Sequence, residues 1–477
     1  MALMLEKSLV PSRLFSCLIA ISMFLLIFST LFLFQFNEIS FVPSVLKIIN
    51  INSSSVYFRP NVQSEHIQKP SVDSTLLTNQ PTRSQEICNV NQDVLRVYMY
   101  DLPPEFHFGL MGWSRTGNQV WPDVRNHSQI PQYPGGLNLQ HSMEYWLTLD
   151  LLSSNTPDVR RPCTVIRVSK PDQADIMFVP FFSSLSYNRY SKLRGEETVS
   201  VNSVLQDRLV DFLEGRDEWK RLKGKDHLIV AHHPNSMLTA RTKLGSAMFI
   251  LADFGRYPVE IANLDKDVIA PYKHIIRTTP ASKSYSFRDR PTLVYFQGAI
   301  YRKDGGAVRQ ELYYLLKDEK DVHFTFGSVG ANGVSQAGQG MATSKFCLNI
   351  AGDTPSSNRL FDAIATHCVP VIISDDIELP FEDVLDYSTF CIFVRASDAL
   401  KKDYLLNLLR GIKQDRWTKM WEKLKDVEKH FEYQFPSRPG DAVDMIWGAV
   451  SRKLSSVKNE IHRMNRYRKS QLLSRSP

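Results

Sequence analysis

Cysteine is scarce in this 477-residue chain, which contains six, and no two of them have the C-x-x-C spacing typical of a structural zinc site. The chain also has no internal repeat and no excess of Pro or Gly, with 25 and 22 residues of each. These absences exclude a solenoid, collagen-like, coiled-coil or disordered chain. Most of the sequence has no net charge: the overall +7 equals the excess of Lys and Arg over Glu after Ser451. Such a basic tail does not predict a nucleic-acid-binding domain.

One long hydrophobic run lies near the N-terminus, from Leu14 to Phe36, and contains no charged residue. A helix of this length spans roughly 30 Å, the thickness of the hydrocarbon core of a bilayer. A cleaved signal peptide, the alternative, has a shorter apolar core followed by small residues. We therefore predict an uncleaved signal anchor at residues 14–36. Lys7 and Arg13 place residues 1–13 in the cytosol, which makes a single-pass type II membrane protein with a luminal body.

Residues 37–93 are rich in Ser, Asn, Gln and Pro and predict a flexible stem. The two glycosylation sequons, at Asn52 and Asn126, fall in the predicted luminal part. Five cysteines follow the anchor, an odd number, so at least one is free or paired between chains. Three of them, Cys347, Cys368 and Cys391, are predicted to be buried thiols. A disulfide between the other two, Cys88 and Cys163, stays open.

From Val94 onward, short apolar runs alternate with helical patterns, which is typical of parallel α/β layers. We expect an N-terminal domain at residues 94–285, a C-terminal domain at 286–450 and a basic tail at 451–477. The expected strands are Leu95–Tyr100, Thr164–Val168, Ile176–Phe182, His227–Ala231, Leu293–Phe296, Val322–Phe326, Phe346–Ile350, Val369–Ile373 and Phe390–Val394. The expected helices are Leu139–Leu152, Val201–Leu213, Ala307–Leu316, a long segment Ala399–Tyr433, and one from Gly440 into the tail.

The most informative segment runs from Ser344 to Tyr387, where a predicted strand leads into a loop and then a helix. Open α/β sheets bind ligands beyond the carboxyl ends of their strands. The loop contains Gly352, and Ser357 is placed to cap a helix beginning near Asn358. Amide groups at a helix N-terminus favour an anion such as a diphosphate.

Arg359 and Asp362 follow in that helix and, three residues apart, share one face. The forked donors of Arg suit phosphate oxygens, and the Asp carboxylate suits paired ribose hydroxyls. An ordinary surface ion pair is the alternative interpretation. From the residues alone, the two interpretations have about equal weight.

At this point a family resemblance becomes specific. The segment contains SKFCL, GD, S-x-x-RLFDAI, CVPVIISD and ELPF, and in this it resembles the donor-sugar half of the exostosin-type glycosyltransferases, glycosyltransferase family 47. Upstream stretches at residues 97–104, 174–182 and 224–227 agree, and the resemblance extends over about 94–444. The chain looks like the plant branch, which builds wall polysaccharides in the Golgi, and within it is similar to the arabinosyltransferases of pectic arabinan.

The resemblance implies a GT-B fold, in which two Rossmann-like domains face each other across a cleft. A UDP-sugar would bind to the C-terminal domain, a polysaccharide such as pectin would lie against the N-terminal one, and transfer would invert the anomeric carbon. The protein would reside in the Golgi membrane, alone or in oligomers with other transferases, and would require no metal cofactor. Asp362 matches the position that binds the donor ribose, and Arg359, Ser357 and Gly352 match the diphosphate side. Arg302 is a further candidate for the diphosphate, or else a surface residue.

An inverting transfer needs a base at the acceptor hydroxyl and positive charge at the departing nucleoside diphosphate. For the base, the sequence offers Glu144 on the first luminal helix and four residues around one strand: Asp226, His227, His232 and His233. Of these we nominate Glu144, Asp226 and His233. Each also has an ordinary structural interpretation, as a helix-surface Glu or as a polar group at a strand end. Since one base suffices, most of the nominees must be bystanders.

Three alternatives stay open. The triplet Asp265-Lys266-Asp267 has the D-x-D pattern of metal-dependent GT-A transferases, although a surface turn is the better interpretation. A non-catalytic family member could instead bind glycans or act as a scaffold for an active transferase. The basic tail at 451–477 is interpreted as a solvated end, and as an element holding an acidic glycan only in the second place.

Overall fold

The computed structural model describes residues 94–473, with gaps at 194, 196–197, 303–305, 328–329 and 331. The chain divides into two compact units, Met1–Pro81 and Thr82–Pro477, and the architecture below is that of the second. The predicted anchor at 14–36, the stem at 37–93, Asn52 and Cys88 lie outside the described residues. Within the described part of the chain, every helix falls short of the length or the apolarity needed to cross a bilayer.

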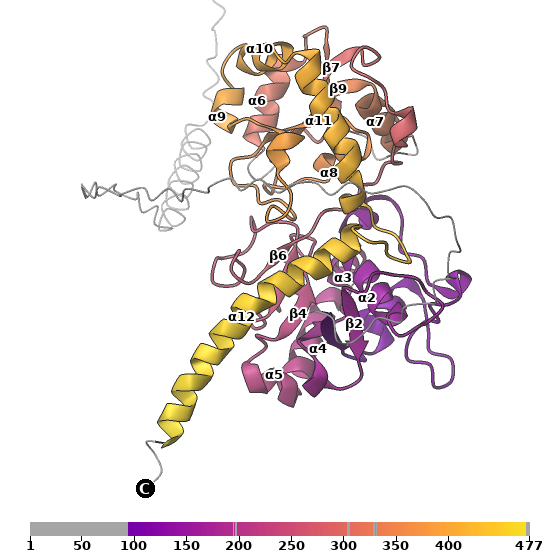
Figure 1. The fold of residues 1–477 in the computed structure, drawn as a ribbon, viewed down its shortest axis with the longest axis vertical. Coiled ribbons are helices and arrows are strands. Elements are labelled where there is room, and N and C mark those ends of the chain that lie inside the picture. Colours follow the sequence, from indigo (N-terminus) through magenta and orange to yellow (C-terminus); the bar gives the residue numbers. More distant parts are fainter. Residues whose placement is uncertain are drawn as a thin grey trace, which may run out of the picture. The chain divides into compact units, whose positions relative to one another are not determined.

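The first α/β half is built on a six-stranded parallel sheet with the order β2-β1-β3-β4-β5-β6. Its strands are β1 (Leu95–Met99), β2 (Val165–Val168), β3 (Ile176–Val179), β4 (His227–Val230), β5 (Met248–Leu251) and β6 (Val268–Ile269). Its helices are α2 (Met143–Ser153), α3 (Ser183–Tyr190), α4 (Val201–Gly215) and α5 (Asp217–Leu222), in the purple and magenta part of Figure 1. Strands β3, β4 and β5 are buried at every position, which explains their uninterrupted apolar sequences.

The second α/β half has a five-stranded parallel sheet with the order β11-β10-β9-β7-β8. Its strands are β7 (Thr292–Gly298), β8 (Val322–Phe326), β9 (Ser344–Ile350), β10 (Val369–Ile373) and β11 (Ile392–Phe393). Its helices are α6 (Ala307–Leu316), α7 (Gly333–Ala342), α8 (Arg359–Ala365), α9 (Ala396–Ala399), α10 (Tyr404–Arg410) and α11 (Gln414–Val427), drawn in orange in Figure 1. Two parallel sheets with connecting helices confirm the predicted α/β class.

Several elements differ from the expectations. Strands β5 and β6 and helix α7 were not predicted, and the long segment Ala399–Tyr433 is not one helix but is interrupted between α10 and α11. Helix α7 contains three glycines, a composition that disfavours a helix in isolation. Packing requires one of them, because a Cβ at Gly340 would lie 2.2 Å from the ring of Tyr295. Tertiary contact therefore overrides the local preference.

The C-terminal helix α12 (Ala442–Leu473, yellow in Figure 1) belongs to the first half, although the chain reaches it after the second. As predicted, this helix runs into the basic tail at 451–477, as far as Leu473, and most of the described side chains of the tail are exposed. Basic side chains of α12 pair with the first half: Lys458 Nζ lies 2.9 Å from the Asp175 carboxylate. The last residues of the predicted domain 286–450 therefore belong to a helix that packs on the first half.

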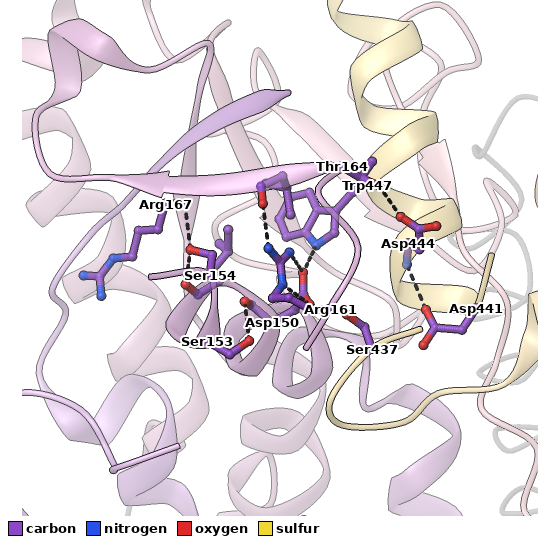
Figure 2. Close-up of polar contacts among 12 residues, drawn as sticks. Asp150, Ser153, Ser154, Arg161, Thr164, Arg167, Ser437, Asp441, Asp444 and Trp447 are labelled. Atoms are coloured by element: carbon purple, nitrogen blue, oxygen red, sulfur yellow. Dashed lines mark hydrogen bonds and ion pairs between the residues drawn. The ribbon is translucent and has the colours of Figure 1, made fainter. Parts of the chain in front are cut away.

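A buried ion pair lies where α12 meets the first sheet (Figure 2). Asp150 on α2 accepts two hydrogen bonds from the Arg161 guanidinium, at 2.6 and 2.9 Å. It also accepts the indole N–H of Trp447 on α12, at 3.0 Å, and the hydroxyl of Ser437 in the preceding segment. One carboxylate thus joins the region of α2 to a segment that lies 287 to 297 residues further along the chain.

The prediction of buried thiols is wrong for Cys347 and Cys368, which form a disulfide. Strands β9 and β10 are parallel neighbours in which Cys347 stands opposite Pro370, so Cys368 comes within a Cα–Cα distance of 5.7 Å. Cys391 is free and buried, as predicted. Cys163 is disulfide-bonded, but Cys88 lies outside the described residues, so their pairing stays a prediction.

Replacing both Cys347 and Cys368 by Ala is expected to lower the free energy of unfolding by about 3 kcal/mol. The bridge closes a loop of 21 residues, and its loss leaves the unfolded chain more conformational freedom. The midpoint of urea denaturation measures the effect, with Cys391→Ala as the control that removes a buried sulfur but no cross-link. An unchanged midpoint for the double variant would contradict the expectation.

Candidate active site

A cavity of about 510 Å³ lies between the carboxyl ends of the two sheets. On the first half, its walls come from the loops after β4 and β6, which carry His233 and Tyr272. On the second half, they come from the loops after β7, β8 and β9. Carboxyl ends of parallel strands are the edge at which open α/β sheets bind ligands. A larger groove of about 1450 Å³ runs beside α12, but none of the predicted site residues lines it.

Three arginines converge on the second-half wall of the cavity: Arg302, Arg309 and Arg359. Arg302 forms an ion pair of 3.0 Å with Asp353. Arg309 is buried and Arg359 is half-buried, and within the described part of the chain neither has a carboxylate at ion-pair distance. Burial lowers the pKa of Arg309 to about 9 and that of Arg359 to about 10, and their mutual repulsion adds to the shift at Arg309. This part of the cavity is therefore suited to an anion.

Backbone carbonyls hold these two guanidinium groups in place. Arg309 donates to Ile350 O at 2.6 Å and to Ala299 O at 3.2 Å. Arg359 donates to Gln297 O at 2.9 Å and to the Ser357 hydroxyl at 3.1 Å. Carbonyl acceptors orient the charge without neutralising it.

Two glycines make room for these guanidinium groups. A Cβ at Gly352 would lie 2.8 Å from Arg309 Nη2, and one at Gly298 would lie 1.9 Å from Arg359 Nη2. Gly352 was predicted for the diphosphate side of the site because of its loop. In the structure its missing side chain allows Arg309 to reach the cavity.

Helix α8 begins at Arg359, with Asn358 as its N-cap and no side-chain capping bond. The N-cap thus lies one residue after the predicted Ser357, but the Ser357 hydroxyl does accept the backbone N–H of Arg359, at 3.4 Å, as well as its guanidinium, at 3.1 Å. Asp362 lines the cavity, and its carboxylate accepts from the backbone N–H of Ile275 and from Asn358 Nδ2, both at 2.9 Å. Burial raises its pKa.

Asn358 emerges from the structure as an additional cavity residue. The hydrogen bond from its Nδ2 to Asp362 fixes the orientation of the side-chain amide. Its Oδ1 is buried and has no hydrogen-bond partner among the described residues. A buried amide oxygen without a donor is costly unless a ligand supplies one. The predicted ribose residue, Asp362, thus orients a neighbouring acceptor that a sugar hydroxyl can fill.

On the opposite wall, three histidines and a tyrosine are in contact. The rings of His141 and His233 have centroids 4.6 Å apart, and His141 Nδ1 lies 2.8 Å from His232 Nδ1. The ring of Tyr272 lies 5.0 Å from that of His141, and its hydroxyl lies 2.8 Å from Ser356 of the second half. Burial lowers the pKa of His232 to about 3 and that of His233 to about 4, and takes that of His141 well below its ordinary value.

The alternative interpretation of Glu144 as a helix-surface residue is wrong, because Glu144 is fully buried beneath α3. Its Oε1 accepts the N–H groups of Ser184 and Leu185, at 3.1 and 3.4 Å, in the first turn of that helix. Burial raises its pKa to about 8. It does not line the cavity, but Ser184 links it to His233, whose backbone N–H donates to the Ser184 hydroxyl.

Asp226 stands before β4, at the amino edge of the first sheet and away from the cavity. There it pairs with Arg221 at 2.8 Å and with His227 at 3.0 Å. In the D-x-D triplet, Asp265 is exposed on a turn, as predicted, whereas Asp267 is buried and accepts the N–H groups of Phe249 and Asn263. In the described part of the chain, no cluster of three or more His, Cys, Asp or Glu is arranged to hold a metal ion.

The structure thus brings six of the eight nominated residues to one cavity: His233, Arg302, Gly352, Ser357, Arg359 and Asp362. It leaves Glu144 and Asp226 outside. Sequence reasoning missed Arg309, Asn358 and His141. Arg309 lies in an ordinary amphipathic helix, so no local signal marks it. His141 could have been found from its place in a loop after β1, since that loop also ends at the carboxyl edge.

Two parallel sheets whose carboxyl edges enclose an arginine-lined cavity define an α/β protein built to bind an anionic ligand between its halves. Residues 91–409 match the Exostosin GT47 domain. The chain is 40% identical over 370 residues to "Probable arabinosyltransferase ARAD1" of Arabidopsis thaliana, covering 77% of this chain and 80% of that relative. It is 26% identical over 395 residues to "Probable xyloglucan galactosyltransferase GT17" of the same plant, covering 75% and 82%. The chain therefore belongs to the exostosin GT47 family and is a glycosyltransferase.

Among solved structures, the chain is similar to the pneumococcal O-GlcNAc transferase GtfA in complex with UDP and GlcNAc. The TM-score is 0.28 at 10% identity, over 53% of this chain and 60% of that one. For the S. aureus TarM G117R mutant the TM-score is 0.29 at 9% identity, over 65% and 58%. Likenesses this low carry no argument about this chain.

Proposed function

We propose that this protein is an inverting glycosyltransferase of GT-B architecture that moves arabinose from a UDP-sugar to a pectic polysaccharide. The observation that carries the proposal is the group of Arg302, Arg309 and Arg359 at the carboxyl edge of the second sheet. The guanidinium groups of Arg309, which is buried, and of Arg359, which is half-buried, have no carboxylate partner among the described residues, and they repel each other in the absence of an anion. A nucleoside diphosphate supplies that anion. The 40% identity to an arabinosyltransferase supports the choice of sugar and of polymer.

The chemistry divides between the two walls of the cavity. The arginines stabilise the charge that develops on the departing diphosphate, and we propose that they do so without a metal ion. The Asn358 Oδ1, oriented by Asp362, accepts a hydroxyl of the nucleoside ribose or of the donor sugar. The acceptor polysaccharide lies on the wall of the first half, beside His141 and His233.

We place this reaction in the Golgi lumen, with the chain anchored as a type II membrane protein through residues 14–36. The Cys347–Cys368 disulfide supports an oxidising compartment. Asn126 is exposed at the start of a short 3-10 helix, where an oligosaccharyltransferase can reach it. Some basic side chains of α12 form ion pairs with the first half, so we assign this helix no role in binding an acidic glycan.

Binding to a panel of nucleotide sugars tests the proposed function. The purified full-length chain is expected to bind one UDP-pentose selectively, with the same affinity in EDTA, because arginines supply the positive charge. Isothermal titration calorimetry or a thermal-shift assay measures the binding, and release of UDP in the presence of arabinan oligosaccharides measures transfer. Loss of binding in EDTA would favour a metal-dependent transferase, and failure to bind any donor would favour the non-catalytic scaffold.

A further inference from the structure

We propose that His141 is the catalytic base of the transfer reaction, and that His232 is the positioning residue that holds its ring in the required tautomer. This inference rests on the proposed inverting transfer, and goes beyond it by assigning the proton acceptor. His141 ends a 3-10 helix (Gly136–His141) in the loop between β1 and α2 and lines the cavity.

A chain of hydrogen bonds fixes the protons on the two rings. His232 Nε2 lies 3.1 Å from the carbonyl oxygen of Ala270, which only accepts, so Nε2 carries the proton. In the neutral ring, His232 Nδ1 is then an acceptor. His141 Nδ1 lies 2.8 Å from it and must donate. In the neutral ring, the remaining nitrogen of His141, Nε2, is therefore unprotonated.

The neighbouring His233 has the opposite tautomer. Its Nδ1 accepts the backbone N–H of Asn235 at 3.1 Å, which places the proton of the neutral ring on Nε2. His233 can thus donate a hydrogen bond to the acceptor sugar but cannot remove its proton. Of the three nominated bases, Glu144 and Asp226 do not reach the cavity. His141 is the cavity histidine whose Nε2 carries no proton.

The position of His141 suits an in-line displacement. The arginines lie on the second-half wall and His141 on the first-half wall, so a donor sugar between them has the leaving group on one side and the base on the other. The acceptor hydroxyl gives its proton to His141 Nε2 while its oxygen bonds to the anomeric carbon. The bond from that carbon to the diphosphate oxygen breaks, and its electron pair leaves with UDP.

The surroundings hold the ring neutral before the donor binds. Burial, with His232 and His233 beside it, lowers the pKa of His141 well below its ordinary value, so the free enzyme holds it neutral. A diphosphate bound at the arginines brings negative charge into the same cavity and favours the protonated ring. The base thus gains strength when the donor is present.

Substitution of His141 tests the assignment. His141→Gln is expected to lower kcat about 10²- to 10⁴-fold, the usual contribution of a general base. The Kd for UDP should stay within about 3-fold of the wild-type value, because the arginines bind the donor on the other wall. The matched control is His127→Gln, the same substitution at an exposed histidine outside the cavity. A kcat for His141→Gln equal to that of the control overturns the proposal.

Substitution of His232 tests the positioning role separately. His232→Asn keeps an acceptor close to the place of Nδ1, whereas His232→Leu removes it and lets His141 take the other tautomer. We expect kcat to fall toward the His141→Gln level in the Leu variant and to recover in the Asn variant, at constant Kd for UDP. Equal kcat values for the two variants contradict a tautomer-fixing role.

A spectroscopic readout needs no substrate. In the full-length chain labelled with ¹⁵N-histidine, the signals that disappear in His141→Gln should report an unprotonated Nε2 and a protonated Nδ1. The reverse tautomer overturns the proposal even if the activity assay fails. Kinetic comparisons use whichever nucleotide sugar the wild-type chain accepts. A donor other than UDP-arabinose therefore overturns the proposed substrate, while an active His141→Gln overturns the base.

Discussion

Arg359→Gln is expected to weaken the binding of UDP about 10- to 100-fold, the loss that follows when a charge-assisted hydrogen bond of about 1.5–3 kcal/mol is removed. The half-buried guanidinium donates to Gln297 O and to the Ser357 hydroxyl, which aim it at the cavity without neutralising it. Gln keeps a polar side chain but removes the charge. Calorimetric titration with UDP measures the Kd, and rising salt should narrow the difference between the variant and wild type.

Arg290 provides a matched control. It is a buried arginine whose pKa, like that of Arg359, is lowered by desolvation to about 10, and it too donates to a backbone carbonyl, Ser344 O at 2.7 Å. It does not line the cavity. Arg290→Gln should therefore lower the free energy of unfolding and leave the Kd for UDP unchanged. Arg359→Gln should raise that Kd, and it also relieves the repulsion between arginines in the empty cavity. Equal losses of UDP affinity in both variants would refute the anion site.

The contrast between these arginines shows what the sequence could predict of the site. Arg359 and Asp362 follow a buried strand and a glycine-containing loop, so their place at a carboxyl edge is readable from the chain. Arg309 lies on α6, and only the folded structure shows that it passes Gly352 to reach Ile350 O. His141 likewise meets His232 across a separation of 91 residues. Pairings of this kind depend on how sheets are assembled, not on local pattern.

The fold, like the site, was predictable where a local sequence pattern marks an element, and not where the structure depends on contacts between distant parts of the chain. Strands such as β8 and β10 are mostly apolar or β-branched runs, and their bounds agree with the prediction. Strand β6 has two residues, too few for a recognisable period. The return of α12 to the first half depends on Trp447 and Asp150, which nothing in the sequence connects.

That return leads to the largest expected loss of stability. Asp150→Ala should lower the free energy of unfolding by about 3–5 kcal/mol, because it leaves the Arg161 charge buried without its partner. The two side chains are 3% and 4% exposed, so water cannot compensate. Ser437 and Trp447 lose their acceptor as well, which loosens α12 (Figure 2). The shift in the urea denaturation midpoint measures the effect.

Two further variants separate the charge from the packing. Glu105→Ala breaks an exposed pair with Arg208 and is expected to change stability by less than about 1 kcal/mol. Replacing Asp150 by Leu and Arg161 by Met together removes both buried charges, and should recover much of the loss caused by Asp150→Ala. If the double variant is no more stable than the single one, the hydrogen bonds to Ser437 and Trp447, rather than the unpaired Arg161, hold α12 on the first half.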